Sequence, residues 1–305
     1  MRRILRSVGL LVGLLGVAFV TRELVRSWDD VSEAVTGANP VLLAAALLVG
    51  CAGPLAIGLG WRRCLTLLGA RHRVRDTLHW YYVGQLGKYV PGGIWTVVGR
   101  GEMARRAGVP GGIGYSSTIL SLALTYLAAV LTMALALATG AGGGDGVAWQ
   151  PVLILLPLGL LALHPQVVRA ALRAGRRLLR RELQIPVPRW RDSIGLLVML
   201  VPAWLAIGGA TWLVAAALDP GTPSARNVMF ATALAWIAGF IVVPAPGGIG
   251  VREAVFVAAA ISLSSAGIAA AVAVVARVMF ILIDLIGAAT STALVRSRTK
   301  TGPSG

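Results

Sequence analysis

The sequence predicts an all-α polytopic membrane protein, and three observations carry that prediction. The chain is 57% hydrophobic and only 13% charged, whereas about a quarter of the residues in a soluble domain are charged. Several uncharged runs reach the roughly 20 residues that a helix needs to cross a bilayer: residues 41–60, 114–140 and 193–218. Basic residues lie in short clusters between such runs, where the positive-inside rule expects them.

Six apolar segments are expected to form full transmembrane helices: residues 4–20, 41–60, 116–138, 149–163, 193–218 and 266–294. Two further apolar regions are interrupted by glycine and proline, which end helices, so each is expected to form a broken hairpin. About eight membrane segments result, within a single membrane domain that covers residues 1–305. Its expected parts are a first half (1–164, with a broken hairpin at 77–110), a basic cytoplasmic loop (165–192), a second half (193–295, with a broken hairpin at 228–264) and a short cytoplasmic tail (296–305).

The loop charges predict the orientation. With both termini in the cytoplasm, most of the 28 Lys and Arg residues fall in cytoplasmic loops, as the positive-inside rule requires. The first broken hairpin must then open to the cytoplasm and the second to the outside. Each hairpin is either re-entrant or a pair of short crossings. The arginine-rich composition is typical of GC-rich bacteria, so we expect the bacterial cytoplasmic membrane.

A nucleic-acid partner is not expected, although the net charge is +16. A nucleic-acid-binding protein gathers basic residues on one face, whereas these are divided among the loops. The two cysteines and three histidines form no cluster with metal-ligand spacing. A Walker-type phosphate loop is also missing from the sequence. The sequence therefore predicts no metal site and no cofactor.

The two broken regions share a short pattern, Pro-Gly-Gly-Ile followed by Arg and Glu. The residues are Pro91, Gly92, Gly93 and Ile94 with Arg100 and Glu102 in the first region, and Pro246, Gly247, Gly248 and Ile249 with Arg252 and Glu253 in the second. Because the two hairpins open to opposite sides, the pattern predicts an inverted repeat. Transporters with such repeats hold their substrate near the membrane midplane, at discontinuous helices.

Broken helices of this kind favour an anion site. Backbone freed by proline and glycine survives at membrane depth only inside protein or beside a watery cavity. A helix that starts after Gly-Gly points its N–H groups and positive dipole end at that cavity, which suits phosphate, and a nearby guanidinium adds bidentate pairing. The candidate substrate-binding residues are Lys88, Tyr89, Pro91, Gly92, Gly93, Arg100, Pro246, Gly247, Gly248, Arg252 and Arg277.

Three carboxylates in or near the broken regions and the last helix are candidate counter-ions or proton carriers: Glu102, Glu253 and Asp284. Charges at membrane depth are costly and usually functional. The structural alternative is a network in which Arg252 pairs with Glu253 and Arg277 with Asp284. Lys88 has the alternative of reaching the membrane surface with its long side chain. No residue is expected to be catalytic.

Three further features have simple alternatives. Arg100 and Glu102 have the alternative of lying in the cytoplasmic interface rather than at the cavity. The aromatic residues 80–82 are expected to anchor the chain at the membrane interface. Residues 167–183 alternate Arg with Val and Leu, which suits an amphipathic helix bound to anionic inner-leaflet lipids or a plain basic loop that sets topology.

Two motifs resemble a known family. Residues 85–95 (QLGKYVPGGIW), with Gly99-Arg100 and residues 104–109 (ARRAGV), are similar to the flippase-like membrane family that includes the N-terminal membrane domain of bacterial lysylphosphatidylglycerol synthases. Residues 242–253 (VVPAPGGIGVRE), with Arg277 and Asp284, resemble it too. The resemblance spans nearly the whole chain and implies an eight-segment-type fold with re-entrant hairpins and a role in lipid translocation.

The resemblance has one departure. The bifunctional synthases carry a large soluble catalytic domain after the membrane part, whereas this chain ends shortly after its last apolar segment, so lysyl transfer by this chain alone is not expected. We expect a lipid flippase or scramblase that moves an anionic, phosphate-bearing lipid such as a phospholipid or a polyprenyl-phosphate-linked lipid, and not an enzyme. The alternatives are a non-catalytic membrane partner of a cytoplasmic or membrane envelope-biosynthesis enzyme, and an integral-membrane lipid-linked transferase.

Overall fold

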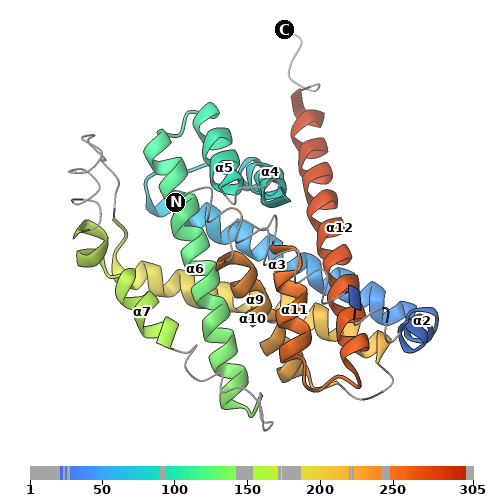
Figure 1. The fold of residues 1–305 in the computed structure, drawn as a ribbon. Coiled ribbons are helices and arrows are strands. Elements are labelled where there is room, and N and C mark those ends of the chain that lie inside the picture. Colours follow the sequence, from blue (N-terminus) through green and yellow to red (C-terminus); the bar gives the residue numbers. More distant parts are fainter. Residues whose placement is uncertain are drawn as a thin grey trace, which may run out of the picture.

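The computed structural model is all-helical over the residues that it describes (Figure 1). These are residues 21–22, 25, 28–89, 94–141, 154–170, 173, 187–219, 221, 223–241 and 248–299. Among them the structure places α2 (Trp28–Thr36), α3 (Pro40–Leu67), α4 (Val74–Gln85), the 3-10 helix η1 (Leu86–Tyr89), α5 (Trp95–Arg106), α6 (Gly111–Ala138), α7 (Leu155–Ala162), α9 (Trp190–Leu218), α10 (Ala225–Ile241), α11 (Val251–Ala259) and α12 (Ala266–Thr299).

Four helices in the described part of the chain are long and apolar enough to cross a membrane: α3, α6, α9 and α12. They confirm four of the six predicted crossings and show a multi-pass membrane protein. The predicted crossing at residues 4–20 lies outside the described residues. Of the one predicted at 149–163, residues 149–153 lie outside them as well, and the eight residues of α7 are too few to span a bilayer.

Glycine lets α3 and α9 pack closely. A Cβ on Gly53 would lie 2.6 Å from Cγ1 of Ile207, and one on Gly60 would lie 2.8 Å from Cδ2 of Leu200. Lipid tails are as apolar as leucine, so helices in a membrane associate through close backbone approach rather than through exclusion of water. The glycine face of α3 therefore fixes the pair of long helices that lies across the molecule in Figure 1.

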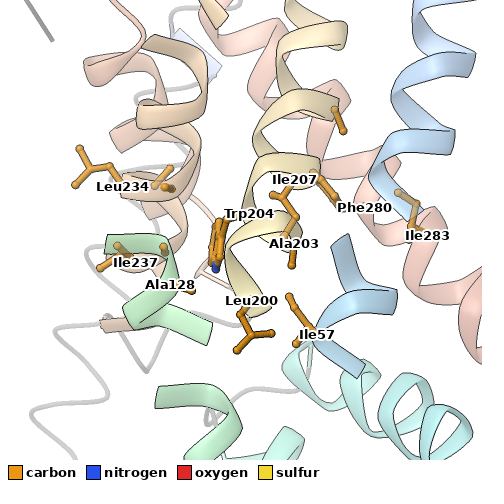
Figure 2. Close-up of a cluster of buried hydrophobic side chains, with 14 of the residues drawn as sticks. Ile57, Ala128, Leu200, Ala203, Trp204, Ile207, Leu234, Ile237, Phe280 and Ile283 are labelled. Carbon is orange, nitrogen blue, oxygen red and sulfur yellow. The ribbon is translucent and has the colours of Figure 1, made fainter. Parts of the chain in front are cut away.

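Trp204 of α9 lies at the centre of the buried core (Figure 2). Its indole Nε1 donates a hydrogen bond of 2.6 Å to the carbonyl oxygen of Thr125 on α6. Its ring meets Trp236 of α10 edge-on at 5.7 Å, and Trp236 meets Phe280 of α12 edge-on at 5.6 Å. The hydrogen bond and the two ring contacts thus join α6, α9, α10 and α12, and the rings on either side hold Trp236 in a fixed position.

Each of the two predicted broken regions has short helices on both sides of its Pro-Gly-Gly motif. In the first, α4 and η1 lead to the break and α5 follows it; in the second, α10 and α11 flank the break. The two arms of each hairpin pack against each other. Each arm has fewer than the roughly 20 residues that span a bilayer.

The hairpins open toward opposite ends of α6, a helix about 42 Å long. At its first turns, α6 packs against α5, where Tyr115 lies against Gly101. Beyond its last turn, the carbonyl oxygen of Thr139 accepts a 2.6 Å hydrogen bond from Arg226 at the start of α10. This arrangement agrees with the opposite openings predicted from the loop charges.

Candidate functional site

Both hairpins reach the middle of α12. The first follows α12 inward from its carboxyl-terminal part: the Oγ1 of Thr292 lies 3.3 Å from Nδ1 of His79, and Tyr89 reaches Asp284. The second hairpin meets α12 through Glu253, which bonds to Arg277. Arg277 and Asp284 are seven residues apart, two helical turns or about 10 Å. The structure therefore brings the charges of the two hairpins together along one short stretch of α12.

Asp284 ties the first hairpin to α12. Its carboxylate is 1% exposed, and its Oδ2 lies 2.5 Å from Nζ of Lys88 and accepts a 2.6 Å hydrogen bond from the hydroxyl of Tyr89. The ammonium group of Lys88 also lies 5.7 Å from the ring centre of Trp236 on α10. Lys88 thus points into the protein at the junction of the two hairpins rather than toward the membrane surface.

Glu253 performs the same task for the second hairpin. Its Oε1 accepts a hydrogen bond from Nη1 of Arg277, and its Oε2 accepts a 2.7 Å bond from the backbone N–H of Gly250, which caps α11. One carboxylate therefore pairs a buried cation and also fixes the start of the helix that follows the break. A backbone N–H group at the amino-terminal end of α11 is in this way satisfied by the side chain of Glu253, a residue of the same helix.

Arg252 is placed differently, because it forms no ion pair with any residue that the structure describes. Its guanidinium lies 3.8 Å from the ring centre of Trp236. A cation held over an aromatic face gains about 0.5–2 kcal/mol, which does not replace a neutralising partner. The guanidinium remains available to an anion.

A narrow cavity lies beside Arg252. It is bordered by Trp236, Arg252, Glu253 and Arg277, with hydroxyl side chains from α9 and α10. Its volume is about 30 Å³, room for one or two water molecules and not for a phosphate group. The cavity among the described residues is therefore too small for a headgroup, which would require the hairpins to move apart.

Arg100 occupies the equivalent place in the first hairpin and is 1% exposed. Its guanidinium lies 4.2 Å from the ring centre of Tyr81 and donates through Nη2 to Gln85. Its Nε and Nη1 have no hydrogen-bond partner in the described structure, and the hydroxyl of Tyr81 has none either. Such groups cost about 1–3 kcal/mol each unless water or a ligand satisfies them. Arg100 is therefore an interior residue, and its predicted alternative at the membrane interface is wrong.

The two hairpins repeat one local unit. In the first hairpin, the guanidinium of Arg100 lies over the ring of Tyr81, and the Arg100 side chain packs on Gly84. In the second, the guanidinium of Arg252 lies over the ring of Trp236, and the Arg252 side chain packs on Gly239. In each case the glycine follows the aromatic residue by three positions and precedes Pro-Gly-Gly by seven. This spacing is visible in the sequence and would have identified both aromatic residues as site residues.

The predicted structural network is corrected in its pairing. Glu253 pairs with Arg277, and Asp284 with Lys88, rather than Arg252 with Glu253 and Arg277 with Asp284. Both residues of each predicted pair lie on one helix, whereas each observed pair joins a hairpin to α12. This choice of partners leaves Arg252 without a carboxylate.

Glu102 does not join the interior charges. It lies at the outer end of α5, where Arg105 donates two hydrogen bonds to it (2.7 and 2.8 Å) and Arg106 one (2.9 Å). These bonds lower the pKa of Glu102 to about 2, so the carboxylate stays ionised at physiological pH. The structure gives no support to a role for Glu102 as a proton carrier.

The predicted interfacial anchor at residues 80–82 is also wrong. Trp80, Tyr81 and Tyr82 are all buried in the protein. Tyr82 packs against Gly287, where an added Cβ would lie 2.3 Å from the ring. A short run of aromatic residues does not reveal whether its surroundings are lipid headgroups or other helices.

Several predicted site residues lie at the breaks themselves. Pro91, Gly92, Gly93, Pro246 and Gly247 lie outside the described residues. Gly248 is described: its φ is +70°, and a Cβ there would lie 2.8 Å from Cα of Gly239. Glycine is required at this position because the backbone is left-handed and another backbone passes close by.

A substitution at Gly239 tests the geometry of the repeated unit. A Cβ there would lie 2.2 Å from Cγ of Arg252, so Gly239→Ala should move the guanidinium off Trp236 and cost about 1–3 kcal/mol through overpacking. Thermal unfolding in detergent measures this loss. Gly209→Ala is the matched control, because its nearest neighbour would be 3.7 Å away. Equal stability of the two variants would contradict the packing described.

A comparison with protein families places the chain. The family described as the lysylphosphatidylglycerol synthase TM region matches residues 6–288, which is nearly the whole chain. The chain belongs to this family. The resemblance stated from the two hairpin motifs is thereby confirmed, and the paired hairpins and the part of α12 up to residue 288 lie within the matched residues.

Membership of the lysylphosphatidylglycerol synthase TM family indicates a membrane function connected with lipids. No curated protein matches the chain. The geometry of this chain identifies the groups that could carry its chemistry. They are the two ion pairs at α12, the two arginines that lie over aromatic rings, and the small cavity beside Arg252.

Proposed function

We propose that this protein is a lipid flippase or scramblase that moves a lipid with an anionic, phosphate-bearing headgroup across the bacterial cytoplasmic membrane. The observation that carries the proposal is the guanidinium of Arg252. It stands at the break of a hairpin, beside a cavity, on an aromatic ring, and has no carboxylate partner among the described residues. A cation in the membrane interior is costly without a partner, and an anionic headgroup supplies one.

The arrangement of the hairpins supports a translocation path. Tyr89, just before the first break, and Glu253, just after the second, both bond to the middle of α12. The hairpins open toward opposite ends of α6, so a site between them can be exposed to each side in turn. Such alternation is typical of transporters built from inverted repeats. We propose that both hairpins are re-entrant, since their arms are short, and that both termini are cytoplasmic.

Each interior residue has a proposed role. Arg252 binds the headgroup phosphate, with Lys88 and Arg277 released to it when the hairpins separate. Glu253 and Asp284 hold these two cations while the site is empty, and they are the candidates for proton coupling. We propose that the chain has no catalytic residue of its own. Because the sequence contains no Walker-type phosphate loop, the energy for transport comes from a proton gradient or from downhill movement of the lipid.

A proteoliposome assay tests this function. Purified protein is reconstituted with a fluorescent anionic phospholipid, and a leaflet-specific quencher reports its movement. Arg252→Gln is expected to lower the rate at least about tenfold, as expected for a lost charge-assisted contact of about 1.4 kcal/mol or more. Arg105→Gln is the control, because Arg105 is exposed and pairs only with Glu102 in the described structure.

Two outcomes would contradict the proposal. A folded Arg252→Gln variant that moves lipid at the full rate would remove Arg252 from the site. Failure of the folded wild-type protein to move any phosphate-bearing lipid would instead favour a membrane partner of an envelope-biosynthesis enzyme, and product formation from a lipid-linked substrate would favour a transferase.

A further inference from the structure

The interior of the protein carries more positive than negative charge. Four cations of the hairpins and α12 face one another in the described structure, against two carboxylates. The cations are Lys88, Arg100, Arg252 and Arg277, and the carboxylates are Glu253 and Asp284. The two breaks add nothing to this balance, because residues 90–93 and 242–247 contain no ionisable side chain. Over the described residues and the two breaks, the excess is therefore two positive charges.

The excess is located on two residues. The ion pairs with Asp284 and Glu253 account for Lys88 and Arg277. Arg100 and Arg252 form no ion pair with any described residue, and each lies over an aromatic ring. Removal of one charge from water costs several kcal/mol, more than the roughly 0.5–2 kcal/mol that a cation–π contact returns.

The two guanidinium groups that form no ion pair with a described residue both lie near Lys88. The Lys88 ammonium and the Arg252 guanidinium lie 5.7 and 3.8 Å from the ring centre of Trp236. The Arg100 side chain packs on Gly84, four residues before Lys88. The N–H groups of Arg100 that have no partner lie deep in the protein, since the residue is 1% exposed. A single ligand that entered between the hairpins would meet both charges.

We propose that the headgroup which this protein carries is a phosphate monoester, with about two negative charges, rather than a phosphodiester with one. This inference rests on the proposed function and names its substrate class. A phosphate monoester near pH 7 carries a charge of about −1.5 to −2 and offers three acceptor oxygens. It neutralises both guanidinium groups at once. A phosphodiester would leave one of them unmatched inside the membrane.

Binding measurements on the detergent-purified protein test the inference. The probes are phosphatidic acid and a short polyprenyl phosphate, which are monoesters, phosphatidylglycerol, which is a diester, and inorganic phosphate, which lacks a lipid tail. At pH 8 both monoester lipids should bind at least about tenfold more tightly than phosphatidylglycerol. A preference between the two monoesters identifies the tail. Equal binding of inorganic phosphate would overturn the assignment to a lipid.

The pH dependence separates charge from shape without any mutation. The second pKa of a phosphate monoester is about 6, so at pH 5 the monoester keeps one charge and its advantage over phosphatidylglycerol should shrink to about threefold or less. The protein groups around the two arginines are Tyr81, Tyr126, Lys88 and the two carboxylates, and Tyr89 and Arg277 border them. Phosphatidylglycerol, measured at both pH values, controls for their titration. An advantage that is independent of pH would overturn the proposal.

A variant links the preference to Arg100. Arg100→Gln should lower the ratio of monoester to phosphatidylglycerol affinity at pH 8 from at least about tenfold to about one, because a single guanidinium then remains for either headgroup. If this variant does not fold, the wild-type pH comparison still decides. Transport is read separately: tight monoester binding without movement would contradict the proposed function alone, whereas equal binding and equal movement of phosphatidylglycerol would contradict this inference alone.

Discussion

Asp284→Ala is expected to have the largest effect on stability of any single substitution in this protein. It removes the partner of Lys88 and the acceptor of the Tyr89 hydroxyl at once. Breaking a buried ion pair by removing one partner costs about 3–5 kcal/mol, because the other charge stays buried without compensation. Thermal or denaturant unfolding in detergent measures the loss, and lipid translocation should fall with it.

A double variant shows whether this pair is needed for the fold or for function. Replacement of both charges, as in Lys88→Met with Asp284→Leu, should recover most of the stability, since an apolar pair of similar size is often as stable as a buried ion pair. Translocation should stay low, because the variant has no Lys88 ammonium group to move from Asp284 to the headgroup. Full translocation by a stable double variant would show that the pair serves only the fold.

The second-largest effect is expected for Glu253→Gln. This change removes the carboxylate that pairs with Arg277 and weakens the cap at Gly250. We expect a cost of about 3–5 kcal/mol for the ion pair and up to about 1 kcal/mol more for the cap. The interior then carries one negative charge fewer, so an anionic lipid should restore stability more strongly in this variant than in the wild type, as linkage to ligand binding requires.

The matched comparison for Glu253→Gln is Asp219→Asn. Asp219 is also a buried carboxylate, but it accepts hydrogen bonds from the backbone N–H groups of Gly221 and Ser264 and pairs with no cation in the described structure. An anionic lipid should not rescue Asp219→Asn beyond its effect on the wild type. Equal rescue of the two variants would mean that the lipid acts on the protein surface rather than on the interior charges.

The membrane fold was largely predictable because apolar length is a local property. The runs that became α3, α6, α9 and α12 could be identified directly, and the two Pro-Gly-Gly motifs located the breaks of both hairpins. Where α3 extends past the predicted end at residue 60, it does so because Arg62 and Arg63 are compatible with the end of a transmembrane helix near the headgroups. Charge marks a membrane border but does not end a helix.

The site was only partly predictable because its partners are distant in the sequence. Lys88, Arg252, Glu253 and Asp284 were correctly identified as interior charges, yet which carboxylate meets which cation depends on how the hairpins pack along α12. The role of Tyr81 was missed because a run of aromatic residues is also typical of a membrane interface. Its match to Trp236 emerges only when the glycine three residues later is compared in both hairpins.

The most direct test of the central claim is to locate the headgroup during transport. A phosphate-bearing lipid with a photoreactive diazirine next to its phosphate is reconstituted with the protein, illuminated, and mapped by mass spectrometry. Passage of the headgroup between the hairpins predicts adducts on the segment from Trp236 to Glu253 and on α12 near Arg277, lost in Arg252→Gln. Adducts confined to lipid-facing residues of the long helices, unchanged in Arg252→Gln, would contradict passage of the headgroup between the hairpins.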